Sequence, residues 1–268
     1  MTGDADIDAL IVAGFCAFLG LFVGSFLNVV IYRVPAGESV VSPRSKCPRC
    51  GTQLSAWDNV PVISWLVLRA KCRKCGTHIS ARYPLVEVAT AVLFGCVGWW
   101  LGAAWDLPAY LYLAAVGVAL AMIDLDTRRL PNSIVLPSYV VAIVLLGIAA
   151  VVNQQMADLG RAVIGGMIAF AIYFILALIY PAGMGFGDVK LAGVLGIYLG
   201  WVGWSSLAVG IFTAFVIGAV VGLTLMATGR GGRKTAVPFG PFMIVGTFIG
   251  LWCGPLIMNW YLSVIGLT

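Results

Sequence analysis

Long apolar runs separated by short polar connections fill most of the 268-residue sequence. A membrane-spanning helix needs about 20 mostly apolar residues. We expect eight such helices, the sixth of them short, over residues 9–32, 85–104, 107–123, 133–152, 160–180, 189–204, 205–228 and 238–265. The pattern therefore predicts an all-α polytopic membrane protein.

A single long polar stretch, residues 33–84, interrupts this pattern. It divides the chain into three parts: a first transmembrane helix over residues 1–32, the polar stretch itself, and a multi-helix membrane domain over residues 85–268. We expect the polar stretch to form a small domain of its own between the first and second spans.

The composition supports a membrane protein. Hydrophobic residues make up 61% of the chain and charged residues 10%, with a mean hydropathy of +1.02. Soluble domains are typically about 45–50% apolar and about 25% charged.

The basic residues predict the orientation in the membrane. If the N-terminus lies outside, fifteen of the sixteen basic residues, including the cluster at residues 230–234, fall on the cytosolic side, and Arg161 alone falls outside. Because basic residues favour the cytosolic side, we expect both termini to lie outside.

Four cysteines in the polar stretch form two CxxC pairs, "CPRCG" and "CRKCG". Two residues between thiolates let one tight turn offer both sulfurs to a tetrahedral ion, and the glycine after each pair suits such a turn. Four sulfur ligands leave no open coordination position, so a bound zinc ion would be structural. The alternatives are free thiols or two disulfides. The predicted zinc ligands are Cys47, Cys50, Cys72 and Cys75.

The remaining metal-ligating residues have simpler interpretations. His78 lies three residues after the last of these cysteines and could replace a ligand, although a surface histidine is the simpler reading. Cys16, Cys96 and Cys253 lie within apolar runs, where we expect them to be buried as small apolar side chains.

Three aspartates lie where predicted spans meet the cytosol. Asp188 follows three glycines in "PAGMGFGDVKLAG", and Asp124 and Asp126 lie in "AMIDLDTRRLPNSIVLP". Ionisable groups near the hydrocarbon are costly and mark candidate functional sites. Two carboxylates held close together share one proton, so one can act as a base on water while the other polarises an amide carbonyl. This is the chemistry of an aspartyl protease.

Other interpretations of these aspartates stay open from the residues alone. Asp188 could cap a helix N-terminus, and Asp124 could face Arg128 or Arg129 on its own helix. Asp126 is a rival to Asp124, although the two point in different directions on a helix, so at most one should face Asp188. A proton or cation relay of a transporter would also use such acids.

Taken together, several stretches resemble the type IV prepilin peptidases, bifunctional leader peptidase/N-methyltransferases of bacterial pilus, secretion and competence systems. They are "GLFVGSFLNVVIYRVP", the CxxC pairs, "NVPVISWL", "RYPLVE", "IDLDTRRLPN", "GMGFGDVKLAG" and "PFGPF". The resemblance implies a peptidase domain in the cytoplasmic (inner) membrane that cleaves prepilin leaders at the cytosolic face. It assigns the catalytic roles to Asp124 and Asp188.

The same resemblance implies N-methylation of the new N-terminus with S-adenosylmethionine. Family members commonly have a glycine where this chain has Ala70, which could weaken methylation and leave a peptidase alone. No donor-binding fingerprint is present; Glu87 and Lys71 are weak candidates for cofactor binding. We expect prepilins and membrane lipids as partners and no nucleic acid, and the sequence does not predict the oligomeric state.

Overall fold

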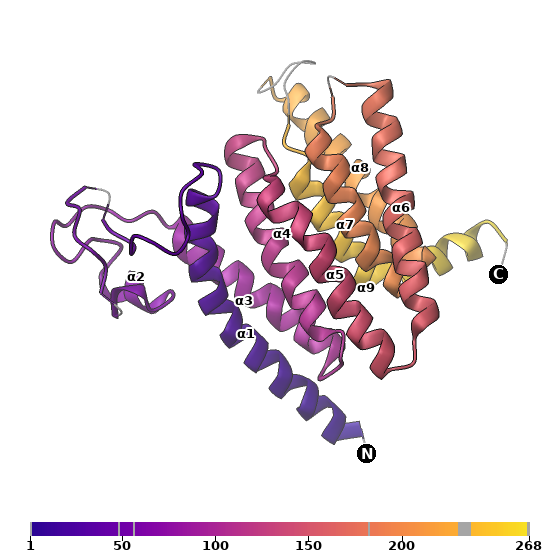
Figure 1. Cartoon of the computed structure of the whole chain (residues 1–268), viewed down its shortest axis with the longest axis horizontal. Helices are drawn as coiled ribbons and strands as arrows, with labels where there is room; N and C mark the ends of the chain where they lie inside the picture. The colour runs from indigo at the N-terminus through magenta and orange to yellow at the C-terminus, as the bar shows by residue number, and fades with distance from the viewer. Residues whose placement is uncertain (1, 48, 56, 182, 230–236, 267–268) are drawn as a thin grey trace. The chain divides into compact units, whose positions relative to one another are not determined.

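A computed structural model describes the chain except residues 1, 48, 56, 182, 230–236 and 267–268, and describes only the backbone of residues 2–6. The predicted basic cluster at residues 230–234 lies outside the described residues. The described part is all-helical, as predicted. Its elements are α1 (Thr2–Arg33), η1 (Trp57–Asn59), α2 (Ile63–Val67), α3 (Arg82–Leu101), α4 (Leu107–Thr127), α5 (Asn132–Val152), α6 (Met156–Ile179), α7 (Phe186–Val202), α8 (Trp204–Ala227) and α9 (Gly240–Val264) (Figure 1).

Seven of the described helices are long and apolar enough to cross a membrane: α1, α3, α4, α5, α6, α8 and α9. The predicted short sixth span corresponds to α7, which has 17 residues. At 1.5 Å per residue it is about 26 Å long, slightly less than the roughly 30 Å of a hydrocarbon core. Gly203 separates α7 from α8, one residue before the predicted boundary.

The chain forms two compact units, Met1–Ala119 and Leu120–Thr268. In the first unit, α1 and α3 pack closely because glycines let the two backbones approach. A Cβ atom at Gly20 would lie 2.7 Å from Cα of Ala91, and one at Gly24 would lie 2.7 Å from Cα of Glu87. Small residues at helix contacts are typical of membrane proteins, in which packing rather than water exclusion holds helices together.

In the second unit, α7 is the central helix, and twelve of its seventeen residues are buried. Glycines again mediate the contacts. A Cβ atom at Gly196 would lie 2.6 Å from the carbonyl oxygen of Gly165 on α6, and one at Gly250 of α9 would lie 2.6 Å from that of Ser206 on α8. Tight backbone contacts that tolerate no larger side chain therefore set the packing of α7 on α6 and of α9 on α8.

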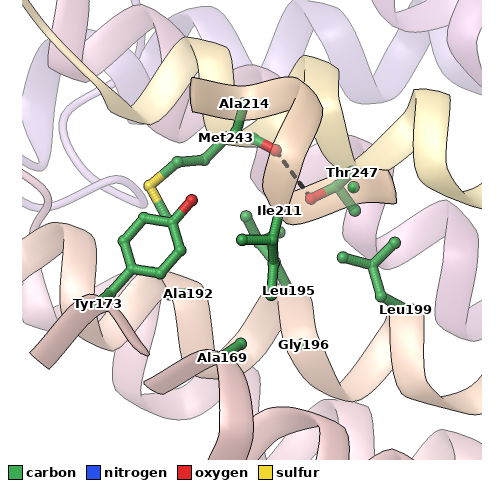
Figure 2. Close-up of a pocket in the computed structure, with 11 residues that line it drawn as sticks. Ala169, Tyr173, Ala192, Leu195, Gly196, Leu199, Ile211, Ala214, Met243 and Thr247 are labelled. Carbon is green, nitrogen blue, oxygen red and sulfur yellow. Dashed lines mark hydrogen bonds between the residues drawn. The ribbon is translucent and has the colours of Figure 1, made fainter. Parts of the chain in front are cut away.

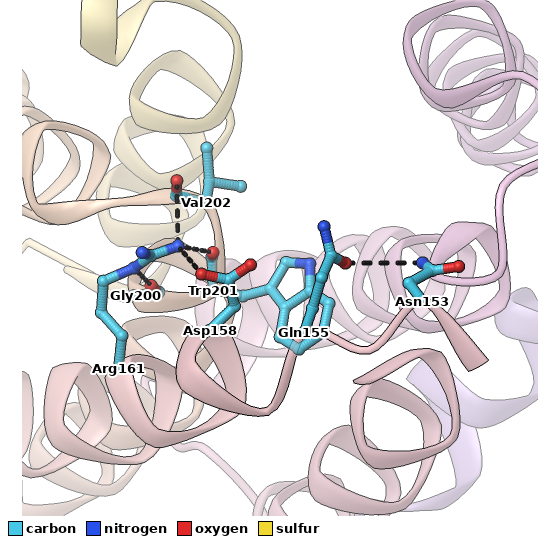
Figure 3. Close-up of polar contacts among 7 residues, drawn as sticks. All are labelled: Asn153, Gln155, Asp158, Arg161, Gly200, Trp201 and Val202. Carbon is cyan, nitrogen blue, oxygen red and sulfur yellow. Dashed lines mark hydrogen bonds and ion pairs between the residues drawn. The ribbon is translucent and has the colours of Figure 1, made fainter. Parts of the chain in front are cut away.

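A side chain of α6 closes the C-terminal end of α7 (Figure 3). Arg161 donates to the carbonyl oxygens of Gly200 at 2.7 Å and Trp201 at 2.5 Å, and it pairs with Asp158 at 2.9 Å. The last carbonyls of a helix lack partners within the helix, and a cation there interacts favourably with the helix dipole. Arg161 thus supplies hydrogen-bond donors to the last carbonyl groups of α7, the helix whose first turn carries Asp188.

The three cysteines outside the CxxC pairs differ in exposure. Cys16 is buried as predicted, and Cys253 is half-buried. The prediction was wrong for Cys96, which is exposed on α3. An exposed position on a membrane-spanning helix suits a small apolar side chain equally well, because the surrounding lipid is itself apolar.

Candidate functional site

The two CxxC pairs make matching backbone hydrogen bonds. The backbone N–H of Cys47 donates to the carbonyl of Thr52, and that of Cys72 donates to the carbonyl of Thr77, at 2.9 and 2.8 Å. The glycine after each pair, at position 51 or 76, has φ of +69°, a conformation that glycine adopts without a steric penalty. Both turns therefore direct their two sulfurs to the same side.

The four cysteine sulfurs lie within 4.8 Å of one another. The Sγ atoms of Cys47 and Cys75 are 3.8 Å apart, and those of Cys50 and Cys72 are 4.0 Å apart. Four sulfurs placed about 2.3 Å from a central zinc ion in a tetrahedron would be about 3.8 Å apart. The donor set and its spacing thus fit a metal ion, and the exposed side chain of His78 lies outside this group of four sulfurs.

Threonines two residues after the second cysteine of each pair favour the thiolate form. Thr77 Oγ1 lies 3.3 Å from the sulfur of Cys75, and its hydrogen bond lowers the pKa of that thiol to about 6. The corresponding contact of Thr52, at 3.4 Å, lowers the pKa of Cys50. Metals bind the deprotonated sulfur, so both contacts favour coordination. The CxxC spacing alone gave no reason to single out these threonines.

Ala70, where the family commonly has glycine, lies in the left-handed region with φ of +58°. Its N–H donates to the carbonyl of Trp65, and its carbonyl accepts from the N–H of Ile79. These bonds fix the backbone between α2 and the second cysteine pair. The conformation gives a backbone reason for a glycine at this position, because L-residues with a Cβ are strained there.

The two weak candidates for cofactor binding occupy different environments. Glu87 is buried on α3, and its Oε2 accepts the N–H of Val62 at 2.7 Å. It therefore holds the polar stretch rather than capping its own helix, which begins with Ala81 as N-cap. Lys71 is exposed and pairs through its backbone with His78. Neither residue lines the cavity that the structure shows within its described part.

Asp124 lies in the last turns of α4 and is only 4% exposed. Its Oδ2 accepts the backbone N–H of Gly240, the first residue of α9, at 2.9 Å. A buried carboxylate needs such a partner, and here the partner is a helix N-terminus, which favours negative charge. Asp126, two residues further along, is exposed. The two aspartates thus point in different directions, as predicted.

Asp188 lies in the first turn of α7, three residues after the N-cap Gly185. Its Oδ2 accepts the N–H of the N-cap residue Gly185 at 3.1 Å, so Asp188 caps the helix N-terminus from the third helical position and not from the N-cap position itself. The neighbouring Gly187 packs against Leu130, with 3.1 Å between a Cβ at Gly187 and Cβ of the leucine. Leu130 also contacts Gly240, since a Cβ there would lie 3.4 Å from its Cδ2.

Leu130 therefore links the segment that carries Asp188 to the glycine that binds Asp124. The two carboxylates are close enough for the charge of Asp124 to act on Asp188. Each is held through Oδ2 by the backbone N–H of a glycine. Sequence reasoning gave no role to Gly240, although its "PFGPF" motif was among the matching stretches and pointed to this position.

A small cavity of about 10 Å³ lies among α6, α7, α8 and α9 (Figure 2). Tyr173, Leu195 and Met243 are among the side chains that line it, and the Thr247 hydroxyl donates to the carbonyl of Met243 at 2.8 Å. A space of this size holds about one water molecule. It is too small for a peptide side chain, so the cavity is not a substrate pocket.

The fold and the site define a class of protein: an all-helical membrane protein with two neighbouring carboxylates, of which Asp124 is buried and Asp188 half-buried, and with a four-sulfur cluster. Residues 18–101 match the bacterial peptidase A24 N-terminal domain, and residues 111–223 match the type IV leader peptidase family. The chain belongs to the type IV leader peptidase family, which confirms the resemblance seen in the sequence.

Similar proteins extend the match over most of the chain. A prepilin leader peptidase/N-methyltransferase of Stutzerimonas stutzeri is 37% identical over 92% of this chain and 93% of its own. A protein of the same name from Pseudomonas aeruginosa is 35% identical over 92% of each chain. Another, from Neisseria gonorrhoeae, is 37% identical over 92% of this chain and 93% of its own. No solved structure matches the chain.

Proposed function

We propose that this protein is a prepilin leader peptidase and that Asp124 and Asp188 are its catalytic pair. The observation that carries the proposal is their arrangement: a buried carboxylate on α4 and a second in the first turn of α7, brought together through Leu130 and each held by a glycine N–H. Membership of the family and the similarity to prepilin leader peptidase/N-methyltransferases over 92% of the chain support it.

Peptide cleavage follows from this pair by acid–base chemistry. The two carboxylates share one proton, because two adjacent charges are unfavourable. The ionised member takes a proton from water as the water oxygen attacks the scissile carbonyl carbon. The protonated member donates a hydrogen bond to the carbonyl oxygen, and a proton then passes to the leaving nitrogen as the C–N bond breaks. The glycine N–H groups hold Oδ2 of each carboxylate, so we assign the Oδ1 atoms to water and substrate.

The second activity that we propose is methylation of the newly exposed N-terminal amine with S-adenosylmethionine. The names of the similar proteins support it. The four cysteines would hold a zinc ion, which supplies folding energy to the small unit around them. We assign no residue to the methyl donor, and no step of cleavage depends on the metal.

We further propose that the chain lies in a bacterial inner membrane with the N-terminus outside and the catalytic pair at the cytosolic face. The distribution of basic residues supports this orientation. Prepilins would then meet the pair where their basic leader ends and their apolar helix enters the membrane.

The test is to incubate the purified protein with a prepilin and S-adenosylmethionine and to measure the product by mass spectrometry. We expect loss of the leader and gain of one methyl group. Leader loss without the methyl group would leave a peptidase alone. An intact prepilin that a similar enzyme cleaves in the same assay would contradict the proposal.

A further inference from the structure

The short helix α2 presents an uncovered apolar face. Ile63, Leu66 and Val67 lie on this face, at the i, i+3 and i+4 spacing of one helix side, and are 61%, 60% and 71% exposed. Trp65, on the other side of the helix, donates its indole N–H to the carbonyl of Ile79 at 3.1 Å. The helix is therefore attached to its own unit by one side and leaves three large apolar side chains on the other.

The attachment places α2 level with the start of a membrane-spanning helix. Val62, its N-cap, donates its N–H to Glu87, which lies in the second turn of α3. Val62 has φ of +60°, an unusual conformation for a β-branched residue, so the fold holds this position against a backbone cost. The polar stretch also continues directly into a spanning helix at each end, α1 and α3. These constraints hold α2 beside the first turns of α3.

The polar stretch that contains α2 is basic. Residues 33–84 contain nine basic and two acidic residues, a net charge of +7, and one of the acids, Asp58, is paired with Arg73 at 2.8 Å. Seven of the basic side chains are exposed: Arg44, Lys46, Arg49, Arg69, Lys71, Arg73 and Lys74. In η1, which packs beside α2, Trp57 is 81% exposed. Tryptophan at headgroup level and basic residues near anionic lipid are typical of membrane interfaces.

We propose that α2 is an interfacial helix that lies in the headgroup region of the same bilayer crossed by α1 and α3. Ile63, Leu66 and Val67 face the acyl chains, and the basic side chains of the cysteine unit contact anionic lipid headgroups. A short apolar face beside basic residues is what a helix lying on a membrane requires. The cysteine unit is then held against the membrane surface instead of extending freely into the cytosol.

Lipid fits this face better than a protein partner does. A stable protein interface covers about 800 Å² on each partner, which one turn of helix and a neighbouring tryptophan do not provide. Contact with a bilayer requires no such minimum interface area, because the spanning helices already hold the cysteine unit beside the membrane. The strong positive charge complements the negative cytoplasmic leaflet.

Photo-cross-linking of the full-length protein tests this. A benzophenone side chain replaces Leu66 in one variant and Ser64, on another side of the same helix, in the control. Both are reconstituted in nanodiscs of phosphatidylcholine with a minor share of phosphatidylglycerol. We expect several-fold more lipid adduct at position 66 than at position 64, enriched in phosphatidylglycerol, with an enrichment that falls as salt is added. The proposal would be overturned by equal lipid-adduct yields at the two positions or by no adduct at position 66. Cross-links from position 66 to a second copy of the chain or to an added prepilin would also overturn it.

A second measurement avoids any change to the face itself. Brominated lipids quench tryptophan fluorescence on contact, and the difference between the wild type and Trp57→Phe isolates the contribution of Trp57. We expect this contribution to be quenched most by bromines placed close to the headgroup. A Trp57 signal that brominated lipids leave unchanged would contradict the placement of α2 and η1 at the interface.

Discussion

Replacing Gly240 with alanine would place a methyl group 2.9 Å from Oδ2 of Asp124. Ordinary contacts to a Cβ begin near 3.4 Å, so the carboxylate would have to retreat by about 0.5 Å. The end of a side chain moves easily, so we expect the steric clash itself to cost little stability. The hydrogen bond from the Gly240 N–H would be weakened or lost, and a bond to a charged group contributes about 1.5–3 kcal/mol.

If this bond orients Asp124 for catalysis, Gly240→Ala should lower kcat/KM for leader cleavage by roughly ten- to a hundredfold, since about 1.4 kcal/mol corresponds to a factor of ten. The assay is cleavage of a prepilin by the purified variant, together with its thermal unfolding. The matched control is Gly222→Ala on α8, where a Cβ would meet nothing within 4 Å. Wild-type kcat/KM in a stably folded Gly240→Ala variant would refute the reasoning.

The remaining predictions concern other residues. Asp126→Asn should retain most of the cleavage activity, because Asp126 is exposed and points away from Asp124; an inactive but folded variant would mean that Asp126 is the catalytic residue. Cys72→Ser should lower the bound zinc and loosen the cysteine unit, as measured by metal analysis and proteolysis; unchanged zinc would refute the four-sulfur site. Ala70→Gly should stabilise this unit by about 0.5–1 kcal/mol, because relief of a left-handed conformation exceeds the entropy cost of glycine. The control is Ala81→Gly, at an ordinary φ of −63°, which should not raise the stability of the unit. Equal changes in thermal unfolding for the two variants would contradict the explanation by backbone strain at Ala70.

The helices and the cysteine cluster could be predicted because their signals are local. A run of about 20 apolar residues has few alternatives to a spanning helix, and two CxxC pairs carry their turn geometry with them. The difference in direction between Asp124 and Asp126 likewise follows from helix periodicity alone. The short α7 was also evident from its length in the sequence.

The partners of the acidic residues could not be predicted, because they come from distant parts of the chain. Gly240 is 116 residues from Asp124, and Val62 is 25 residues from Glu87. A backbone N–H donor does not depend on the side chain of its residue, so the residue type in the sequence does not indicate which N–H binds a distant carboxylate. The left-handed backbone at Ala70 was similarly hidden, although the glycine common in the family at that position was a usable signal.

The central claim is that Asp124 and Asp188 together cleave the prepilin leader. The most direct measurement is cleavage of one prepilin by the wild type, Asp124→Asn and Asp188→Asn, each purified from membranes and checked for folding. An amide keeps the shape but cannot act as a base, so each substitution should lower cleavage by about 10²-fold or more. Normal cleavage by either folded variant would contradict the account.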